Sequence, residues 1–197
     1  MGMADRDRKV RLFVAVELPE FVKDALSRLQ AELRESGVRA RWTHTGNIHL
    51  TLKFLGSTPV PLLDPIAAEL ADATARFSPI TLHATGLSVF PGVKRAKVLW
   101  TGISGDTEKL AMLHKRVEEN LLLQGFEKED RRFTAHLTLA RFKDRVDPGV
   151  LVNAIERCGT FVTDPFVVDS VCLFESNLTP KGPVYSCLQS HRLGGEA

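Results

Sequence analysis

The chain has 197 residues, of which 44% are hydrophobic and 25% charged, the composition of an ordinary globular protein that can bury a sizeable core. Its 26 Lys and Arg residues nearly balance its 24 Asp and Glu residues, so the formal net charge is only +2. This balance excludes a strongly polybasic protein that binds nucleic acid by bulk electrostatics, but it is compatible with a local basic cleft. No apolar run approaches the roughly 20 residues of a membrane span. The N-terminal stretch MGMADRDRKV lacks the apolar region of a signal peptide, and we therefore expect a cytoplasmic protein.

The first half of the chain predicts alternating strands and helices. Residues 10–18 are β-branched and apolar, as in a buried strand, and Pro19 ends this run. An amphipathic helix follows and stops at Gly37, after which a strand holds the segment HLTLKFLG at 49–56. A second helix and a third strand follow, at 59–77 and 80–90.

The second half predicts a similar order of elements. A strand, AKVLWTGIS, precedes a long helix from about 106 to 124, and the next strand holds HLTLARF at 136–142. Pro148 opens a short helix. The last two predicted strands are FVVDSVCLFES at 166–176 and GPVYSCLQSHRL at 182–193. The two halves therefore read βαβαβ and βαβαββ.

The segment His-Leu-Thr-Leu occurs at 49–52 and again 87 positions later, at 136–139. The same offset superimposes whole predicted elements: 10–17 on 97–104, 20–36 on 107–123, and 80–90 on 167–177. This repetition predicts a single bilobal α+β domain over 1–197, with pseudo-repeat halves of about 10–90 and 96–192 related by approximate two-fold symmetry. Such symmetry would place His49 and His136 opposite each other across a cleft.

Alternate residues of a strand share a face, which predicts the direction of each side chain in the two motifs. In the first motif, one face is expected to carry His49, Thr51 and Lys53, and the core face Leu50, Leu52 and Phe54. Lys53 would then either add positive charge to the cleft or reach solvent. In the second motif, His136 and Thr138 share a face, and strict alternation puts Arg141 on the opposite one unless a bulge, a twist or the strand end intervenes.

Two facing histidines can divide a proton-transfer task, because imidazole titrates near pH 6.5. A neutral one takes a proton from the nucleophile, and a charged one gives a proton to the leaving group. Thr hydroxyls beside them can donate hydrogen bonds to the oxygens of a phosphate, which suits displacement at phosphorus. A zinc site is an alternative for paired histidines, but no HxH, HExxH or carboxylate cluster accompanies them, and the cysteines show no zinc spacing. Their apolar contexts predict reduced, buried thiols at Cys158, Cys172 and Cys187.

The segments HLTLKFLG and FTAHLTLARF resemble the paired His-x-Thr-x motifs of the 2H phosphoesterase superfamily. The nearer resemblance is to its RNA 2′,3′-cyclic phosphodiesterases, also called 2′-5′ RNA ligases, and it extends to RLFVAVELP, KVLW and SNLTPKGPVYSCL. It implies a bilobal fold with mainly antiparallel sheets around a central cleft. It also implies that His49 and His136 flank a cyclic phosphate without metal or cofactor. The phosphate oxygens would be bound by Thr51, Thr138 and Arg141.

The resemblance implies hydrolysis of RNA 2′,3′-cyclic phosphate ends to 2′-phosphates, with ligation through a 2′-5′ linkage as a related activity. The expected partner is an RNA or oligonucleotide, and the expected state is a monomer. We favour His49 as the acid that protonates the leaving 3′ oxygen and His136 as the base that activates water, but the near-equivalence of the halves leaves this assignment open. A non-catalytic RNA- or nucleotide-binding module that uses the same cleft is the alternative. Phe13, Trp42 and Phe54 are candidates to stack on bases, but core packing is the favoured interpretation of all three. Lys94, Arg95 and Lys97 either follow the RNA backbone or form an ordinary solvated hairpin.

Overall fold

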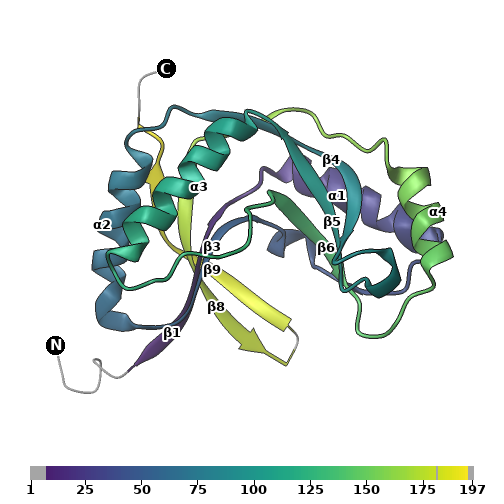
Figure 1. The fold of residues 1–197 in the computed structure, drawn as a ribbon, viewed down its shortest axis with the longest axis horizontal. Helices are drawn as coiled ribbons and strands as arrows, with labels where there is room; N and C mark the ends of the chain where they lie inside the picture. The colour runs from purple at the N-terminus through teal and green to yellow at the C-terminus, as the bar shows by residue number, and fades with distance from the viewer. Residues whose placement is uncertain (1–7, 181, 195–197) are drawn as a thin grey trace.

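The computed structural model describes residues 8–180 and 182–194, and within them it has four α-helices and nine strands (Figure 1). The strands are β1 Lys9–Val16, β2 Arg41–Trp42, β3 Leu50–Pro59, β4 Ile80–Phe90, β5 Val98–Gly105, β6 His136–Arg141, β7 Phe166–Val168, β8 Ser170–Thr179 and β9 Gly182–Arg192. The helices are α1 Glu20–Glu35, α2 Leu63–Thr74, α3 Thr107–Leu122 and α4 Pro148–Cys158. Short 3-10 turns occur at η2 Thr45–Asn47, η3 Val60–Leu62 and η4 Val93–Arg95.

The strands form two sheets, and the paired strands in both are antiparallel. The four-stranded sheet has the order β3-β1-β8-β9, and the five-stranded sheet has the order β2-β6-β5-β4-β7. The predicted α+β class with mainly antiparallel sheets is confirmed. The 87-residue repeat is visible in the sheets as well, because β3-β1-β8 and β6-β5-β4 are equivalent series of strands.

The two halves of the sequence exchange elements. β4 of the first half pairs with β5 in the five-stranded sheet, while β8 of the second half pairs with β1 in the four-stranded sheet. The helices are exchanged too: α2 and α3 pack on the four-stranded sheet, whereas α1 and α4 lie beside the five-stranded one (Figure 1). Each sheet with its helices therefore contains chain from both halves.

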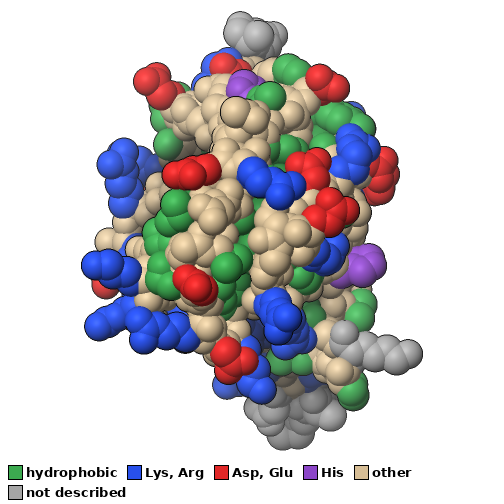
Figure 2. Space-filling model, turned by 90° about the vertical axis from the view of Figure 1, so that its right-hand side faces the viewer, with side chains coloured by type: hydrophobic (Ala, Val, Ile, Leu, Met, Phe, Trp, Pro, Cys, Tyr) green, Lys and Arg blue, Asp and Glu red, His purple; other side chains and the backbone are tan. Residues whose placement is uncertain are grey.

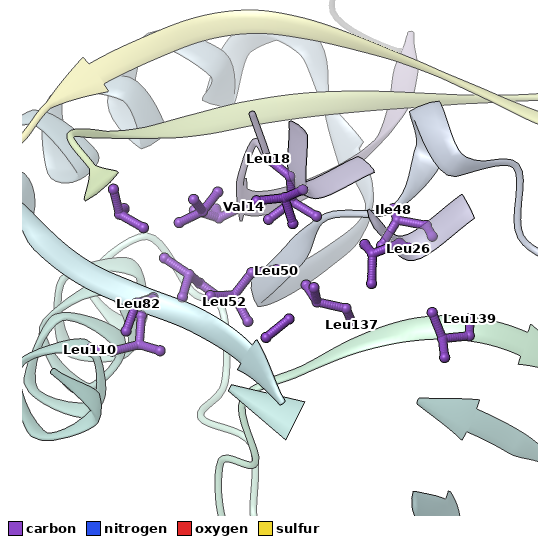
Figure 3. Close-up of a cluster of buried hydrophobic side chains, with 14 of the residues drawn as sticks. Val14, Leu18, Leu26, Ile48, Leu50, Leu52, Leu82, Leu110, Leu137 and Leu139 are labelled. Carbon is purple, nitrogen blue, oxygen red and sulfur yellow. The ribbon is translucent and has the colours of Figure 1, made fainter. Parts of the chain in front are cut away.

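The leucines of the two His-Leu-Thr-Leu segments anchor both motif strands in one core. Leu50, Leu137 and Leu139 are completely buried, and Leu52 is 3% exposed. They belong to a single hydrophobic cluster that extends between the two sheets, and Figure 3 shows Leu50 and Leu137 as neighbours within it. Burying a leucine stabilises a fold by roughly 1.5–3 kcal/mol, so these residues fix β3 and β6 firmly against each other.

The prediction of one continuous strand over 166–176 is wrong, because this segment forms two strands that belong to different sheets. β7 ends at Val168 and β4 pairs with it, while β8 starts at Ser170 and pairs with β1 and β9. The chain crosses between the sheets at Asp169, whose carbonyl accepts a hydrogen bond from the Leu193 amide at 2.7 Å. The only sign of this crossing in the sequence is the polar pair Asp169-Ser170 between the apolar runs 166–168 and 171–174, and the prediction passed over it.

Two further expectations were tested by the structure. Cys158 and Cys172 are buried free thiols as predicted, but Cys187 is exposed on β9. Among the described residues, no helix is both long and apolar enough to cross a membrane.

Candidate active site

The two motif histidines are oriented by equivalent hydrogen bonds. His49 directly precedes β3, and its Nδ1 lies 2.9 Å from the carbonyl oxygen of Asn47. His136 begins β6, and its Nδ1 lies 2.7 Å from the carbonyl oxygen of Thr134. Because a carbonyl oxygen only accepts, Nδ1 carries the proton in both neutral rings and Nε2 is left for chemistry. The repeat therefore extends to the bonds that fix the tautomer of each ring.

The electrostatics of His49 show that the two rings lie near each other. The pKa of His49 is lowered from 6.5 to about 4, chiefly by burial; the hydrogen bond to the Asn47 carbonyl opposes this shift, and the charge of His136 adds to it. The motif strands β3 and β6 are in direct contact. At neutral pH the free protein thus holds His49 as a neutral imidazole, the form that can accept a proton.

Aromatic side chains surround both rings. His49 packs against Phe13 at 4.6 Å and Tyr185 at 5.2 Å between ring centroids, and Phe174 lies 6.3 Å away. His136 is contacted edge-on by Phe90 at 5.2 Å and by Trp100 at 5.8 Å. These rings restrict the orientation of the imidazoles. Apart from Phe13, the sequence analysis named none of them as site residues, because it could not tell which strands lie beside the motifs.

A β-bulge follows each motif at an equivalent position. In β3, Ala15 pairs with Thr51 but Val14 pairs with Lys53, so Leu52 is the extra residue. In β6, Trp100 pairs with Thr138 but Leu99 pairs with Ala140, so Leu139 is the extra residue. Leu52 and Leu139 are 87 positions apart. Each bulge shifts the alternation of its strand by one residue from that point onward.

The bulges reverse the predicted directions of the residues behind them. Lys53 is only 2% exposed and points into the core, whereas Phe54 is 59% exposed, so the predictions for both residues were wrong. Their equivalents are Ala140, which is buried, and Arg141, which is exposed. After a bulge, Arg141 returns to the face of His136 and Thr138, as the sequence analysis required for a functional role.

Arg141 lies close to the surroundings of His49. Burial raises the pKa of Tyr185, and the positive charges of Arg141 and Arg11 oppose that rise. Tyr185 is the residue that packs edge-on against His49. A guanidinium from the five-stranded sheet is therefore within electrostatic reach of the histidine on the four-stranded sheet.

The motif threonines have hydroxyl groups available for a ligand. Thr51 and Thr138 are half-buried and lie two residues after their histidines, on the same side of each strand before the bulge. Within 8–180 and 182–194, no protein hydrogen bond engages either hydroxyl. Two hydroxyls, one guanidinium and two imidazoles thus form a set suited to an anionic phosphate.

Comparison with known proteins identifies the family. The sequence profile of the LigT-like phosphoesterases matches residues 16–100 and, a second time, residues 102–185. The chain belongs to the LigT-like phosphoesterase family. The double match coincides with the internal repeat, and it confirms the resemblance to 2H phosphoesterases. The curated relatives described next confirm the expectation of a phosphodiesterase enzyme.

The relatives of this LigT-like phosphoesterase cover nearly its whole length. An RNA 2′,3′-cyclic phosphodiesterase of Archaeoglobus fulgidus is 34% identical over 181 residues, which are 91% of this chain and 98% of that protein. One of Aeropyrum pernix is 33% identical over 165 residues, or 83% and 92% of the two chains.

Solved structures share the fold. A crystal structure of a Thermus thermophilus protein superimposes with a TM-score of 0.71 at 28% identity and covers 95% of this chain and all of that one. Escherichia coli LigT in complex with 3′-AMP gives a TM-score of 0.75 at 21% identity, with 94% and 99% of the chains covered.

Among the described residues of this LigT-like phosphoesterase, no group of three or more His, Cys, Asp and Glu side chains is placed to hold a metal ion.

Proposed function

We propose that this LigT-like phosphoesterase hydrolyses RNA 2′,3′-cyclic phosphate ends to 2′-phosphates by metal-independent acid–base catalysis. The observation that carries the proposal is the pair of equivalently oriented imidazoles, whose Nε2 atoms have no hydrogen-bond partner among the described residues. We place Thr51, Thr138 and Arg141 at the same site, since they lie on the two motif strands. Relatives at 33–34% identity that bear this activity in their names support the choice of substrate.

The chemistry follows from the positions of these groups. One neutral imidazole takes a proton from water as its oxygen attacks phosphorus, and the other, charged, gives a proton to the 3′ oxygen as its bond to phosphorus breaks. The products are a 2′-phosphate and a 3′ hydroxyl. The two threonine hydroxyls and the Arg141 guanidinium stabilise the negative charge on the non-bridging oxygens. Only RNA carries the 2′ oxygen that this substrate needs, so the reaction itself selects RNA over DNA.

A single copy of the chain supplies every group that the mechanism uses, so we propose that it acts as a monomer. Both histidines, both threonines and Arg141 come from β3, β6 and the residue before β3. Ligation of RNA ends through a 2′-5′ linkage would need a second RNA end aligned at this site. We therefore place ligation second to hydrolysis.

The test is turnover of a nucleoside 2′,3′-cyclic phosphate in the presence of EDTA, with the product identified by phosphorus NMR. We expect the wild-type protein to form the 2′-phosphate and to keep its rate when EDTA is added. His49→Ala and His136→Ala should each lower kcat by about 10²–10⁴-fold, the usual contribution of an acid or base. His83→Ala, which removes a half-buried histidine outside both motifs, should leave the rate within about twofold.

Three results would overturn the proposal. Near-full activity of either motif variant would exclude the acid–base pair. Tight binding of the cyclic nucleotide without turnover would favour a non-catalytic binding module. Loss of activity with EDTA would show that a metal ion takes part. Circular dichroism of each variant separates a loss of chemistry from a loss of folding.

A further inference from the structure

A basic hollow lies between the end of α1 and the start of α4, and neither His49 nor His136 lines it. Its volume is about 530 Å³. Four basic residues line it: Arg39, Arg41, Lys143 and Arg145. The proposed mechanism uses none of them. In a chain whose net charge is only +2, four cations on one wall are a local concentration of charge.

The hollow is continuous with the proposed active site through one pair of residues. Arg41 of β2 lies directly opposite Arg141 of β6, and residues paired in this way project from the same face of a sheet. The next residue, Trp42, is turned to the other face, where the guanidinium of Arg34 on α1 lies 4.6 Å from its ring. Arg41 therefore stands on the same side as Arg141, and it also lines the hollow.

Basic side chains outnumber acidic ones in the lining of the hollow. Within 8–180 and 182–194, no ion pair involves Arg39, Arg41, Lys143 or Arg145, and all four side chains are exposed. Asp144 and Asp147 also line the hollow, so its lining carries an excess of two positive charges. The carboxylate of Asp147 caps α4 by accepting a hydrogen bond from the Gly149 amide at 2.8 Å.

The side of the molecule that bears α1 and α4 is the one seen in Figure 2. Lys and Arg side chains gather along its left edge and over its lower part, while Asp and Glu are more frequent above. A chain of phosphates, with one negative charge per nucleotide, is a ligand that matches the four cations of the hollow.

We propose that this hollow binds the ribose-phosphate backbone of the RNA on the 5′ side of the cyclic phosphate. The inference rests on the proposed function, because it takes the substrate's end to lie between the two histidines. A cyclic phosphate terminates the strand at its 3′ end, so the rest of the RNA leaves the site in one direction only. The RNA backbone would pass Arg141 first and Arg41 next, and then enter the hollow. The hollow offers three further cations: Arg39, Lys143 and Arg145.

The experiment compares two substrates of the same chemistry: a nucleoside 2′,3′-cyclic phosphate and a short oligoribonucleotide that ends in one. The test variant is the double replacement Arg39→Ala/Arg145→Ala, which leaves Arg141 and both histidines untouched. We expect kcat/KM for the oligonucleotide to fall about tenfold, and kcat/KM for the mononucleotide to change by less than about twofold. The slope of log kcat/KM against log salt for the oligonucleotide should become shallower by about 1.4, since each single-strand phosphate contact contributes about 0.7.

The matched control is Lys109→Ala/Lys115→Ala, which removes the same charge from exposed positions on α3 (Figure 1). We expect kcat/KM of this variant to equal that of the wild-type protein on both substrates. An oligonucleotide kcat/KM unchanged by Arg39→Ala/Arg145→Ala, or an equal loss on both substrates or in the α3 control, would overturn the inference. Failure of the wild-type protein to turn over the mononucleotide is a separate result, and it would overturn the proposed function and this inference with it.

Discussion

The two motif histidines share a sequence context but differ in their surroundings. His49 packs on Phe13 and Tyr185, and its burial holds the pKa near 4, while His136 meets the edges of Phe90 and Trp100. Tyr185 comes from β9, a strand at the far end of the chain from His49. The sequence repeat could predict that the two histidines occupy equivalent positions on equivalent strands. It could not predict this asymmetry, because the asymmetry depends on which distant strands pack beside each ring.

The low pKa of His49 predicts a pH dependence of stability. The pKa is about 4 in the folded protein and near 6.5 in the unfolded chain, so the unfolded chain binds more protons between these values. The free energy of unfolding therefore falls as the pH drops from about 6.5 to 4, by roughly 3 kcal/mol from this group alone. Urea titrations at pH 7 and pH 4 measure this fall in the free energy of unfolding. Between these two pH values, the fall should be smaller in His49→Gln than in the wild-type protein, by about 3 kcal/mol. Equal losses in the two proteins would contradict the assigned burial of His49.

At the scale of the strand, the two bulges decide which residues reach the site. Leu52 and Leu139 each shift the alternation, so that Phe54 and Arg141 face outward and Lys53 and Ala140 face the core. Simple alternation predicted His49, Thr51, His136 and Thr138 correctly because they precede the bulges. It failed for Lys53 and Phe54 because an ordinary leucine occupies the bulge, and no glycine or proline marks it.

Buried polar groups support both bulges. The Gln30 amide on α1 donates to the Leu139 carbonyl at 2.9 Å. Behind the other bulge, the Lys53 ammonium binds the Glu118 carboxylate of α3 at 2.8 Å and the Glu127 carbonyl at 2.7 Å. The second oxygen of Glu118 accepts from the Glu129 amide at 3.2 Å. These bonds tie the first motif strand to the segment that leads into His136.

The Lys53–Glu118 pair predicts a large and non-additive effect on stability. Lys53→Met leaves the Glu118 carboxylate buried without its cation, which should cost about 3–5 kcal/mol of unfolding free energy. The double variant Lys53→Met/Glu118→Leu removes both charges, and it should be destabilised by clearly less than the sum of the two single changes. Urea denaturation of the four proteins measures the coupling. Additive losses would show that the pair does not act as a buried ion pair.

At the scale of the whole molecule, the exchange of strands joins the halves into one unit. The repeat predicted two similar halves and their order of elements, but not that β4 and β8 would each enter the sheet of the other half. Asp169 and Ser170 interrupt the apolar pattern of 166–176, but a polar pair does not tell which sheet each flanking run joins, and two sheets with the same strand order are consistent with either connection.

We propose that the chain is a single bilobal domain that unfolds cooperatively. Trp42 and Trp100, the two tryptophans of the chain, lie on β2 and β5, so their fluorescence reports only on the five-stranded sheet. Far-ultraviolet circular dichroism reports on both sheets. Because each sheet contains chain from both halves, the two signals should follow one urea transition with the same midpoint. Two separate midpoints would show that the sheets unfold independently.

The central claim is that one phosphate binds between the two copies of the repeated motif. A crystal structure with a nucleoside 2′-phosphate, the product of the proposed reaction, tests it most directly. We predict phosphate oxygens within hydrogen-bond distance of Nε2 of both His49 and His136, with the hydroxyls of Thr51 and Thr138 as further donors. A nucleotide whose phosphate contacts only one of the two histidines, or neither, would contradict the account.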